Sequence, residues 1–418
     1  MRPTPAQAFS RRSFLARGMR ACCGAFAAVE VIPHRALASP GANERIGVGY
    51  IGLGARGHHI LSHLTEDAHI VAVCDVDARK LAAVASGRNY ACYGDYRRLL
   101  DNRSVDAVVI TTPDHWHALQ AIHACQAGKD VFCDKPLSLT VREGRAMVQA
   151  ARQYNRICQA GPQQRSIPAA IHACNLVRSG KLGKVLEVHC TNNDTSRDCD
   201  LPGEPIPDGL DWDMWLGPSA FHPYNHLLIP SRYKQFGWMA YKPWSGGHMT
   251  SWGTHGLDIM QWGLGMDHTG PMEVEPLGTG LTCPLAYRYT NGVIVKLDDA
   301  PQGGAIFVCE AGKVTVACGI ARYDPPELGK DAPPNLDNFL GHKGPLHTQQ
   351  WLRCLRTRQE PSCPFEIGHR TATVAHIGNI ARWLGRKLRW DPDKEKFCGD
   401  DQADAMLSRP MRAPWRIS

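Results

Sequence analysis

The sequence has no apolar run long enough to cross a membrane as a stable helix. The longest candidate, the mildly apolar stretch from Ala21 to Ile32, is short and is interrupted by Glu30. A spanning helix needs about 20 consecutive apolar residues. The chain also lacks internal repeats and low-complexity tracts. With 43% apolar and 21% charged residues among 418, its composition suits a soluble globular protein, and its length favours two domains.

A strong charge of one sign is also missing. The formal net charge is +7, but residues 1–38 hold six arginines and one acid, so the rest of the chain carries about +2. This balance gives no electrostatic footprint for binding nucleic acid.

Cysteine pairs typical of zinc or redox sites are absent too. Cys22 and Cys23 lie near the N-terminus, and the other 14 of the 16 cysteines form no C-x-x-C pair. We expect most of these 14 to be buried free thiols. Four histidines make a metal site conceivable, but no spacing compels it, so the prediction is no metal. They are His115, His117, His248 and His255.

The first 38 residues have the pattern of an export signal. Ser10-Arg11-Arg12-Ser13-Phe14-Leu15 is a twin-arginine motif, the mildly apolar stretch follows it, and Ala36-Leu37-Ala38 offers a cleavage site. The alternative is an arginine-rich disordered start. The sequence therefore predicts a twin-arginine signal peptide over residues 1–38, the export machinery as a partner, and a periplasmic location. Because this pathway carries folded proteins, we expect the cofactor to be tightly bound.

A glycine-rich turn is the central motif of the sequence. The apolar run 46–51 leads into Gly52-Leu53-Gly54-Ala55-Arg56-Gly57, and a helical pattern follows. In such a unit the first glycine permits a tight turn, the second lets a pyrophosphate approach, and the third lets helix and strand pack closely. A second strand, 70–74, ends at Asp75, where dinucleotide-binding folds place the carboxylate for the ribose hydroxyls. The charge of Asp75 favours NAD over NADP, because it would repel a 2′-phosphate.

Strand and helix patterns alternate from residue 45 to residue 163. Short apolar strands are expected near 105–112, 130–133 and 157–160, with helical patterns between them. This alternation predicts a doubly wound parallel sheet, an NAD-binding Rossmann domain, over residues 45–163. After it, residues 193–244 read as a long ordered loop, and antiparallel strands follow around turns such as Asn291-Gly292.

Several motifs together resemble the Gfo/Idh/MocA family of glucose–fructose oxidoreductases and inositol dehydrogenases. The resemblance covers residues 45–390. It implies an α/β fold in which the Rossmann domain precedes a C-terminal α/β domain with a large, mostly antiparallel open sheet. Residues 164–390 would be this substrate and oligomerisation domain, and residues 391–418 a tail. The motifs are the glycine turn, Thr112-Pro113-x-x-x-His117, Asp134-Lys135-Pro136, Trp212-x-x-Trp215-Leu-Gly-Pro218, and Gly246-Gly247 leading into Trp252-Gly-Thr-His255.

Two catalytic residues are implied by this resemblance. Position alone favours a solvated surface lysine at 135, but the family has Glu-Lys-Pro here, so Lys135 is predicted to hold the reacting oxygen. His255 matches the family's acid/base, although periodicity alone also allows a packed helix with a satisfied histidine. The predicted cofactor-binding residues are Gly52, Leu53, Gly54, Ala55, Arg56, Gly57, Asp75, Thr112, Pro113, His117, Asp134 and Lys135.

The sequence departs from its relatives at position 251. Many relatives have aspartate four residues before the histidine, whereas this chain has Ser251, which cannot supply a negative charge. Asp258, one helical turn after His255, can stand in or serve as a structural hydrogen-bonding group. Further substrate candidates are His115, Trp116, Gln163, Arg165, Trp212, Ser251 and Asp258. Trp212, Trp215, Trp238 and Tyr241 either stack on a sugar ring or pack the loop.

These features predict an exported, NAD-dependent oxidoreductase that acts on a sugar, polyol or glycoside by hydride transfer at a carbinol carbon. One alternative is an NAD-dependent glycosidase or lyase that works through a transient 3-keto sugar. Another is a non-catalytic sugar- or nucleotide-binding protein. Because an open sheet would expose a broad face, we expect a homodimer or homotetramer.

Overall fold

A computed structural model of the protein describes residues 45–64, 68–229, 237–336 and 339–417, without the side chains of 339–344. The predicted signal peptide, 1–38, lies outside the described residues. Among the helices that are described, none has the length and apolar character needed to cross a membrane.

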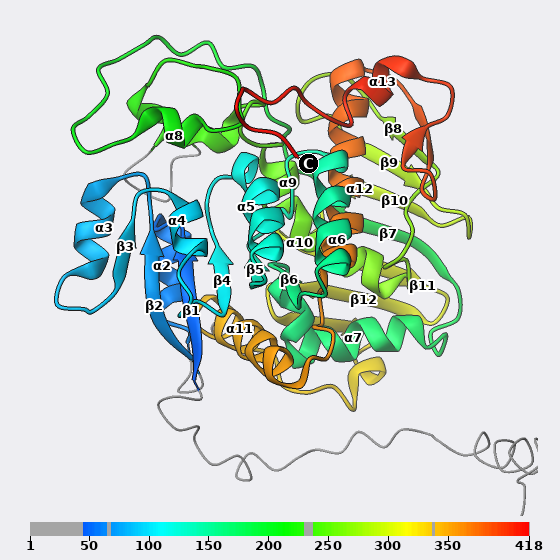
Figure 1. The fold of residues 1–418 in the computed structure, drawn as a ribbon. Coiled ribbons are helices and arrows are strands. Elements are labelled where there is room, and N and C mark those ends of the chain that lie inside the picture. The colour runs from blue at the N-terminus through cyan, green and yellow to red at the C-terminus, as the bar shows by residue number, and fades with distance from the viewer. Residues whose placement is uncertain (1–44, 65–67, 230–236, 337–338, 418) are drawn as a thin grey trace, which may run out of the picture. The chain divides into compact units, whose positions relative to one another are not determined.

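Residues 46–160 form a six-stranded parallel sheet with helices on both faces (Figure 1), as predicted. Its strand order is β3-β2-β1-β4-β5-β6, so the order reverses between β1 and β4. Ligands of such sheets bind at the carboxyl ends of the strands beside this reversal. The strands are β1 (Ile46–Ile51), β2 (Ala68–Cys74), β3 (Ala91–Tyr93), β4 (Ala107–Ile110), β5 (Asp130–Cys133) and β6 (Cys158–Ala160); the helices are α2 (Ala55–Leu61), α3 (Ala78–Ala85), α4 (Tyr96–Leu100), α5 (Asp114–Gln126) and α6 (Val141–Gln153).

The second sheet has nine strands in the order β13-β12-β11-β7-β10-β9-β8-β14-β15. Strands β7 and β10 run parallel, and the other neighbouring pairs are antiparallel, so the predicted mostly antiparallel sheet is confirmed. The strands are β7 (Val185–Thr191), β8 (Glu273–Pro276), β9 (Leu285–Arg288), β10 (Ile294–Asp298), β11 (Gly304–Cys309), β12 (Gly312–Ala317), β13 (Ile320–Asp324), β14 (Leu388–Asp391) and β15 (Lys396–Phe397).

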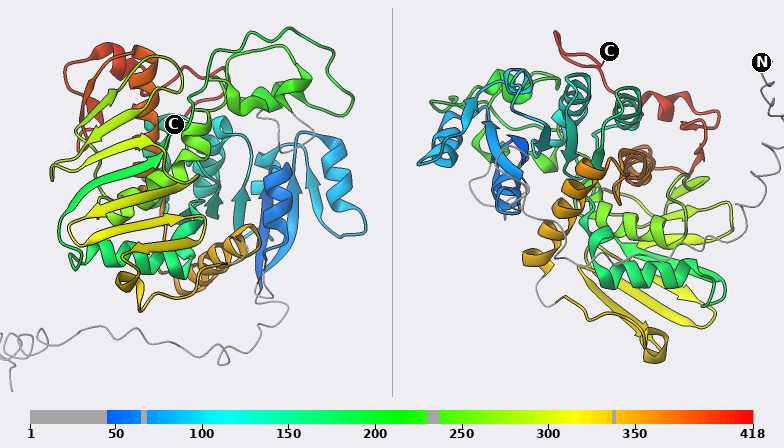
Figure 2. Two further views of the ribbon diagram at one scale, coloured as in Figure 1. Left: turned by 180° about the vertical axis from the view of Figure 1, so that it is seen from behind. Right: turned by 60° about the horizontal axis from the view of Figure 1, so that its bottom comes forward.

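The described helices that pack on this second sheet lie on one of its faces. Inward-facing residues of the strands, such as Val188, Val295 and Phe307, pack in one core with α7 (Pro168–Arg178), α10 (Gly253–Gly263) and α12 (Phe365–Leu384). Figure 2 (left) shows the other face without a described helix in front of it. Buried and half-exposed residues alternate along β7 and β10, because one side of each strand meets the core.

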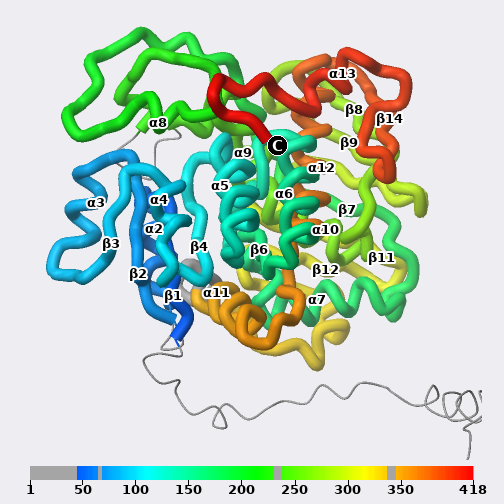
Figure 3. Tube along the Cα trace, viewed as in Figure 1, coloured from blue at the N-terminus to red at the C-terminus, as the bar shows by residue number. Residues whose placement is uncertain are grey.

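The stretch 193–244 packs around its own aromatic core rather than forming an isolated loop. It contains α8 (Trp212–Leu216), η3 (His226–Leu228) and η4 (Gly237–Ala240), and residues 230–236 lie outside the described part. Trp212, Trp215 and Trp244 are among the residues of this core. Figure 3 shows the segment, in green, above α3, and the Ala78 amide donates to the Gly209 carbonyl at 2.8 Å.

Residues 388–417 contact both the second sheet and helix α5 of the Rossmann domain. The β14–β15 hairpin adjoins β8, α13 (Asp401–Ala405) follows it, and the chain then returns to α5. There the Trp415 ring packs edge-on against Trp116 with centroids 4.8 Å apart. The remaining elements are η2 (Gln163–Ser166), α9 (His248–Ser251), η5 (Pro326–Gly329) and α11 (Phe339–Thr357).

Candidate active site

A cavity of about 520 Å³ lies at the carboxyl ends of the parallel strands, and its lining includes residues of α9 together with Met214, Trp215, Ile229, Trp238 and Met239. Twelve of the residues predicted from the sequence line it. They are Gly52, Leu53, Gly54, Ala55, Arg56, Asp75, Thr112, Pro113, Trp116, Asp134, Lys135 and Ser251. The other predicted residues, Gly57, His115, His117, Gln163, Arg165, Trp212, His255 and Asp258, are not among its lining residues.

The glycine turn has the geometry that the sequence predicts. Gly52 follows β1 with φ 93°, and a Cβ there would lie 2.8 Å from the backbone of Thr111 and Thr112. A Cβ on Gly57 would lie 2.3 Å from the Gly52 carbonyl oxygen, so this glycine lets α2 pack against the turn. Around Gly54 there is no atom within 4 Å of an added Cβ. The backbone at Gly54 is therefore open to a ligand that occupies the cavity, which fits a bound pyrophosphate.

Asp75 is held at the cavity wall by main-chain hydrogen bonds. Its carboxylate accepts from the Leu53 amide at 2.7 Å and from the Asp77 amide at 2.9 Å. These bonds tie the loop after β1 to the loop after β2. Lys80, on α3, lines the same end of the cavity. The residues present thus fit a dinucleotide with its adenosine ribose beside Asp75.

Lys135 points from the end of β5 towards α9. Its ammonium donates to the Ser251 hydroxyl oxygen at 3.3 Å, and burial lowers the pKa of this lysine from its usual range. His117 lies behind the wall, where its ring nitrogens contact the Thr112 carbonyl oxygen at 2.9 Å and the Pro136 carbonyl oxygen at 2.8 Å. The sequence predicts that His117 contacts the cofactor, whereas the structure places this residue outside the cavity lining. This buried imidazole clamps the two turns that carry Thr112 and Lys135.

Asp134 and Arg56 form an ion pair inside the cavity. The Nε atom of Arg56 lies 3.2 Å from the carboxylate. Burial is the largest single influence and acts to raise the pKa of Asp134, but the positive charges of Arg56 and Lys135, together with the Arg56 hydrogen bond, lower that pKa overall. Gln163 is not a lining residue; with its amide oriented to satisfy both atoms, its oxygen accepts from Arg56 at 2.6 Å. Gln163 therefore supports the Arg56 side chain rather than lining the cavity.

Asp114 lines the cavity and was missed by sequence reasoning. It begins α5, is 3% exposed, and accepts a hydrogen bond from the Ser245 hydroxyl at 2.8 Å. Burial raises the pKa of Asp114 to about 7. The signal was available within the Thr112-Pro113-x-x-x-His117 motif, because an acid at the first turn after a strand's carboxyl end faces the ligand side of the sheet.

The single helix expected from about Thr250 is interrupted. Trp252 separates α9 from α10, so Ser251 and His255 lie on different helices. His248 and Trp252 line the cavity beside Ser251, whereas His255 is 3% exposed and packs edge-on against Trp252 with centroids 5.8 Å apart. The sequence places His255 at the reacting hydroxyl. In the structure, Ser251 and His248 line the cavity instead, and His255 is not among the lining residues.

Arg165 and Asp258 were expected near substrate and instead pair with each other. The Arg165 guanidinium lies 2.9 Å from Asp258 and 2.7 Å from Asp267, and Thr371 donates to Asp258 at 3.0 Å. Asp258 is fully buried, so it cannot replace the acid absent from position 251. Both residues are buried, pair with each other and are not among the lining residues of the cavity, whereas the sequence predicts that they contact substrate.

Indole rings form much of the remaining wall. Trp116, Trp215, Trp238 and Trp252 line the cavity. Trp212 stacks on Trp215 with centroids 4.5 Å apart, and His115 contacts the Trp215 carbonyl oxygen at 2.9 Å, so these two predicted substrate residues support the wall from behind. Among the described residues there is no group of three or more potential metal-ligating side chains.

A parallel sheet with an open glycine turn, a ribose-facing acid and a buried lysine defines a dinucleotide-binding oxidoreductase fold with a covering second domain. Two family profiles match it: "Oxidoreductase family, NAD-binding Rossmann fold" over residues 46–162 and "Oxidoreductase family, C-terminal alpha/beta domain" over residues 174–417. The chain belongs to the Gfo/Idh/MocA oxidoreductase family.

Named relatives match part of this chain. The chain is 32% identical over 149 residues to inositol 2-dehydrogenase of Salmonella paratyphi B, which is 34% of this chain and 44% of that protein. It is 34% identical over 204 residues to "Glycosyl hydrolase family 109 protein 2" of Shewanella sp. ANA-3, which is 43% of this chain and 44% of that protein. The chain thus spans less than half the length of these curated relatives.

Solved structures share the fold across both domains. Myo-inositol 2-dehydrogenase of Lactobacillus plantarum superposes with a TM-score of 0.61 at 18% identity, over 82% of this chain and 99% of that one. The WlbA dehydrogenase of Bordetella pertussis, solved with NADH and UDP-GlcNAcA, gives a TM-score of 0.59 at 19% identity, over 83% and 99%.

Proposed function

We propose that the protein is an NAD-dependent oxidoreductase that oxidises a carbinol carbon of a sugar, polyol or glycoside. The observation that carries this proposal is the place of Lys135. Its ammonium lies in the same cavity as the open glycine turn and Asp75, and it donates to Ser251 across the cleft. A lysine in this position holds the oxygen of a substrate beside the nicotinamide end of a dinucleotide.

The protein's own residues divide the work. Gly52, Gly54 and Asp75 would hold the dinucleotide, which supplies the hydride acceptor when bound. Lys135 would orient the substrate hydroxyl and stabilise negative charge on its oxygen as the proton leaves. His117 would keep Lys135 in place through the Pro136 carbonyl. The sequence prediction gives the proton to His255.

The cofactor preference follows from charge at the ribose end. The Asp75 carboxylate would contact the 2′-hydroxyl of NAD and repel the 2′-phosphate of NADP. Calorimetric titration tests this directly: we expect NAD⁺ to bind more tightly than NADP⁺. The Asp75→Ser variant is expected to reduce this difference, and tighter NADP⁺ binding by the wild type would contradict the assignment.

A second candidate function is redox-neutral cleavage of a glycoside. It is supported by the similarity to a protein named as a glycosyl hydrolase of family 109 and by the replacement of the usual aspartate by Ser251. In this reaction the substrate would be oxidised to a keto sugar, a base would remove the acidified neighbouring C–H proton as the aglycone leaves, water would add to the resulting enone, and the carbonyl would then be reduced again. The cofactor then returns to its starting state within one turnover.

One experiment separates these functions. The protein is purified, its bound dinucleotide is extracted and identified, and sugars, polyols and aryl glycosides are added with the products analysed. A keto product with an equal amount of reduced nicotinamide supports the oxidoreductase. Release of the aglycone without net reduction supports glycoside cleavage. Dinucleotide binding with neither product would leave the non-catalytic binding protein.

We further propose export and self-association. Export is supported by the arginine pair of Ser10-Arg11-Arg12, and periplasmic fractionation of an Arg11→Lys/Arg12→Lys variant tests it, with retention in the cytoplasm expected.

Association into a dimer or tetramer is supported by the face of the second sheet that no described helix covers, where Leu186 is 55% exposed. A monomer in light scattering would contradict it.

A further inference from the structure

A histidine–aspartate pair lies on the cavity wall beside Ser251. The Nδ1 atom of His248 is 2.7 Å from Oδ1 of Asp194, and His248 lines the cavity. Its hydrogen bond with His248 lowers the pKa of Asp194, so the carboxylate is charged at neutral pH. From the sequence, His248 is considered only as a conceivable metal ligand, and Asp194 is not singled out.

The backbone fixes this pair in place. Gly247, with φ 83°, lets α9 approach the 194–196 segment; a Cβ there would lie 2.5 Å from the Ser196 amide nitrogen. The Met249 amide donates to the Asp194 carbonyl at 2.9 Å. From the other side, the Trp383 indole donates to the Ser196 carbonyl at 3.0 Å. Asp194 is thus positioned by main-chain contacts and by α12.

His248 lies on the same face of α9 as Ser251, the residue that accepts a hydrogen bond from Lys135. His248 and Ser251 are three residues apart, so their Cβ atoms lie about 5–6 Å apart on the helix surface. Ser251 accepts from Lys135, and both Ser251 and His248 line the cavity. A substrate hydroxyl that Lys135 holds therefore lies near the imidazole of His248.

We propose that His248, oriented by Asp194, takes the proton of the substrate hydroxyl, the role that the family resemblance gives to His255. This inference rests on the proposed oxidoreductase function. The substrate O–H bond breaks and an N–H bond forms at Nε2 of His248. The hydride of the same carbon leaves for an oxidised nicotinamide, so the carbon is oxidised to a carbonyl as the nicotinamide is reduced. The Asp194 carboxylate stabilises the charged ring, and the proton then passes to solvent, because the His248 side chain is 20% exposed.

The test compares His248→Ala with His255→Ala and a matched control. We expect His248→Ala to lose about 10²–10⁴-fold in turnover and to recover about tenfold or more when imidazole is added. His189→Ala removes a similar acid-paired histidine, 2.6 Å from Asp298 on β7, and is expected to leave turnover unchanged. Imidazole rescue of His255→Ala but not of His248→Ala would overturn the proposal.

Asp194→Asn provides a second variant. Because Asp194 is a positioning residue, we expect Asp194→Asn to lower kcat by about 10–100-fold and to leave KM unchanged. NAD⁺ affinity, measured by calorimetry, is expected to stay at the wild-type value in both variants, which shows that the cavity is intact. A loss of NAD⁺ binding in both would assign the pair to folding and overturn the catalytic role.

Two different results distinguish a wrong proton acceptor from a wrong proposed function. If Lys135→Met abolishes turnover while His248→Ala retains it, the proton goes elsewhere and the oxidoreductase stands. If the wild type oxidises no sugar, polyol or glycoside, the proposed function falls and this inference falls with it.

Discussion

Burial and charge act against each other on the ionisable residues of the cavity. Burial lowers the pKa of Lys135 and raises the pKa of Asp114, while the Arg56 charge lowers the pKa of Asp134. Groups with opposed shifts in one cleft are typical of sites that exchange protons. Asp114 therefore changes charge close to neutral pH, where Asp134 stays ionised.

The raised pKa of Asp114 makes stability depend on pH. The folded state holds this proton more tightly than the unfolded state, so the contribution is present below pH ~4 and is lost as pH rises through about 7, a loss on the order of 4 kcal/mol. Asp114→Asn keeps a side chain that accepts from Ser245 but cannot ionise. Relative to the wild type, we expect the variant to gain stability between about pH 5 and about pH 8 in denaturant titrations. Parallel stability curves would contradict the burial of a titrating carboxyl.

At the scale of elements, the short helix α9 joins the two domains at the site. Ser245, just before it, donates to Asp114, and Ser251, at its end, accepts from Lys135. His248 between them contacts Asp194 of the second domain. The approach depends on Gly247, whose positive φ and lack of a side chain allow the chain to turn against Thr195 and Ser196.

Gly247→Ala tests this dependence, with Gly87→Ala as its control. Both positions have positive φ, but an added Cβ meets no atom within 4 Å at Gly87. We expect Gly247→Ala to lower the free energy of unfolding by about 2–4 kcal/mol, and Gly87→Ala by about 1 kcal/mol. Denaturant titration measures both changes. Equal costs would show that backbone strain alone matters and that the close contact does not.

The sequence predicts the Rossmann domain well because its signals are local. Buried strands, glycine spacing and Asp75 follow from the pattern of residues along the chain. Side-chain partners across the fold do not. Arg165 and Asp258 lie 93 positions apart, and their pairing required the packing of η2 on α10. The break at Trp252, which moves His255 away from Ser251, likewise depends on tertiary contacts, since a helical period continues through it.

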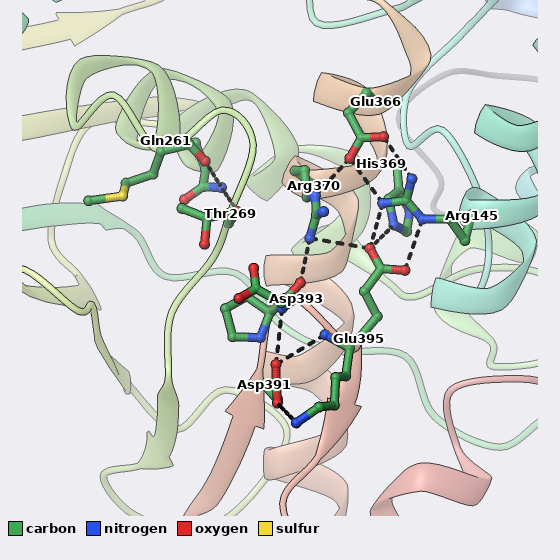
Figure 4. Close-up of polar contacts among 12 residues, drawn as sticks. Arg145, Gln261, Thr269, Glu366, His369, Arg370, Asp391, Asp393 and Glu395 are labelled. Atoms are coloured by element: carbon green, nitrogen blue, oxygen red, sulfur yellow. Dashed lines mark hydrogen bonds and ion pairs between the residues drawn. The ribbon is translucent and has the colours of Figure 1, made fainter. Parts of the chain in front are cut away.

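At the scale of the whole described unit, a charged network joins the Rossmann domain to the second domain. Arg145 of α6 pairs with Glu366 of α12 at 2.7 Å and with Glu395 of the β14–β15 turn at 2.6 Å (Figure 4). Arg370 and His369 add further bonds to the same two carboxylates. Burial opposes their charge, but these bonds outweigh it: they lower the pKa of Glu366 to about 2 and that of Glu395 well below its usual range.

Glu395→Gln is expected to weaken this junction. Removing the charge of Glu395 leaves His369 without its carboxylate and Arg145 with Glu366 alone, at a cost of about 3 kcal/mol at neutral pH. Because the folded pKa is lowered, the contribution is present above pH ~4.5 and is lost as pH falls, so variant and wild type converge in acid. Lys394→Gln, in the same exposed turn, is the control and is expected to unfold like the wild type. A constant difference at all pH values would contradict the charge-based account.

Hydride transfer from a bound sugar is tested most directly by following reduced nicotinamide in wild type and Lys135→Met. The protein is loaded with NAD⁺, mixed with each member of a sugar and polyol panel, and monitored by absorbance in a single turnover. We expect at least one substrate to reduce the cofactor in the wild type, and Lys135→Met to be slower by about 10²–10⁴-fold while it still binds NAD⁺. Equal rates in the two proteins, with the same substrate, would contradict the role of Lys135 and with it the assignment of this cavity as the active site.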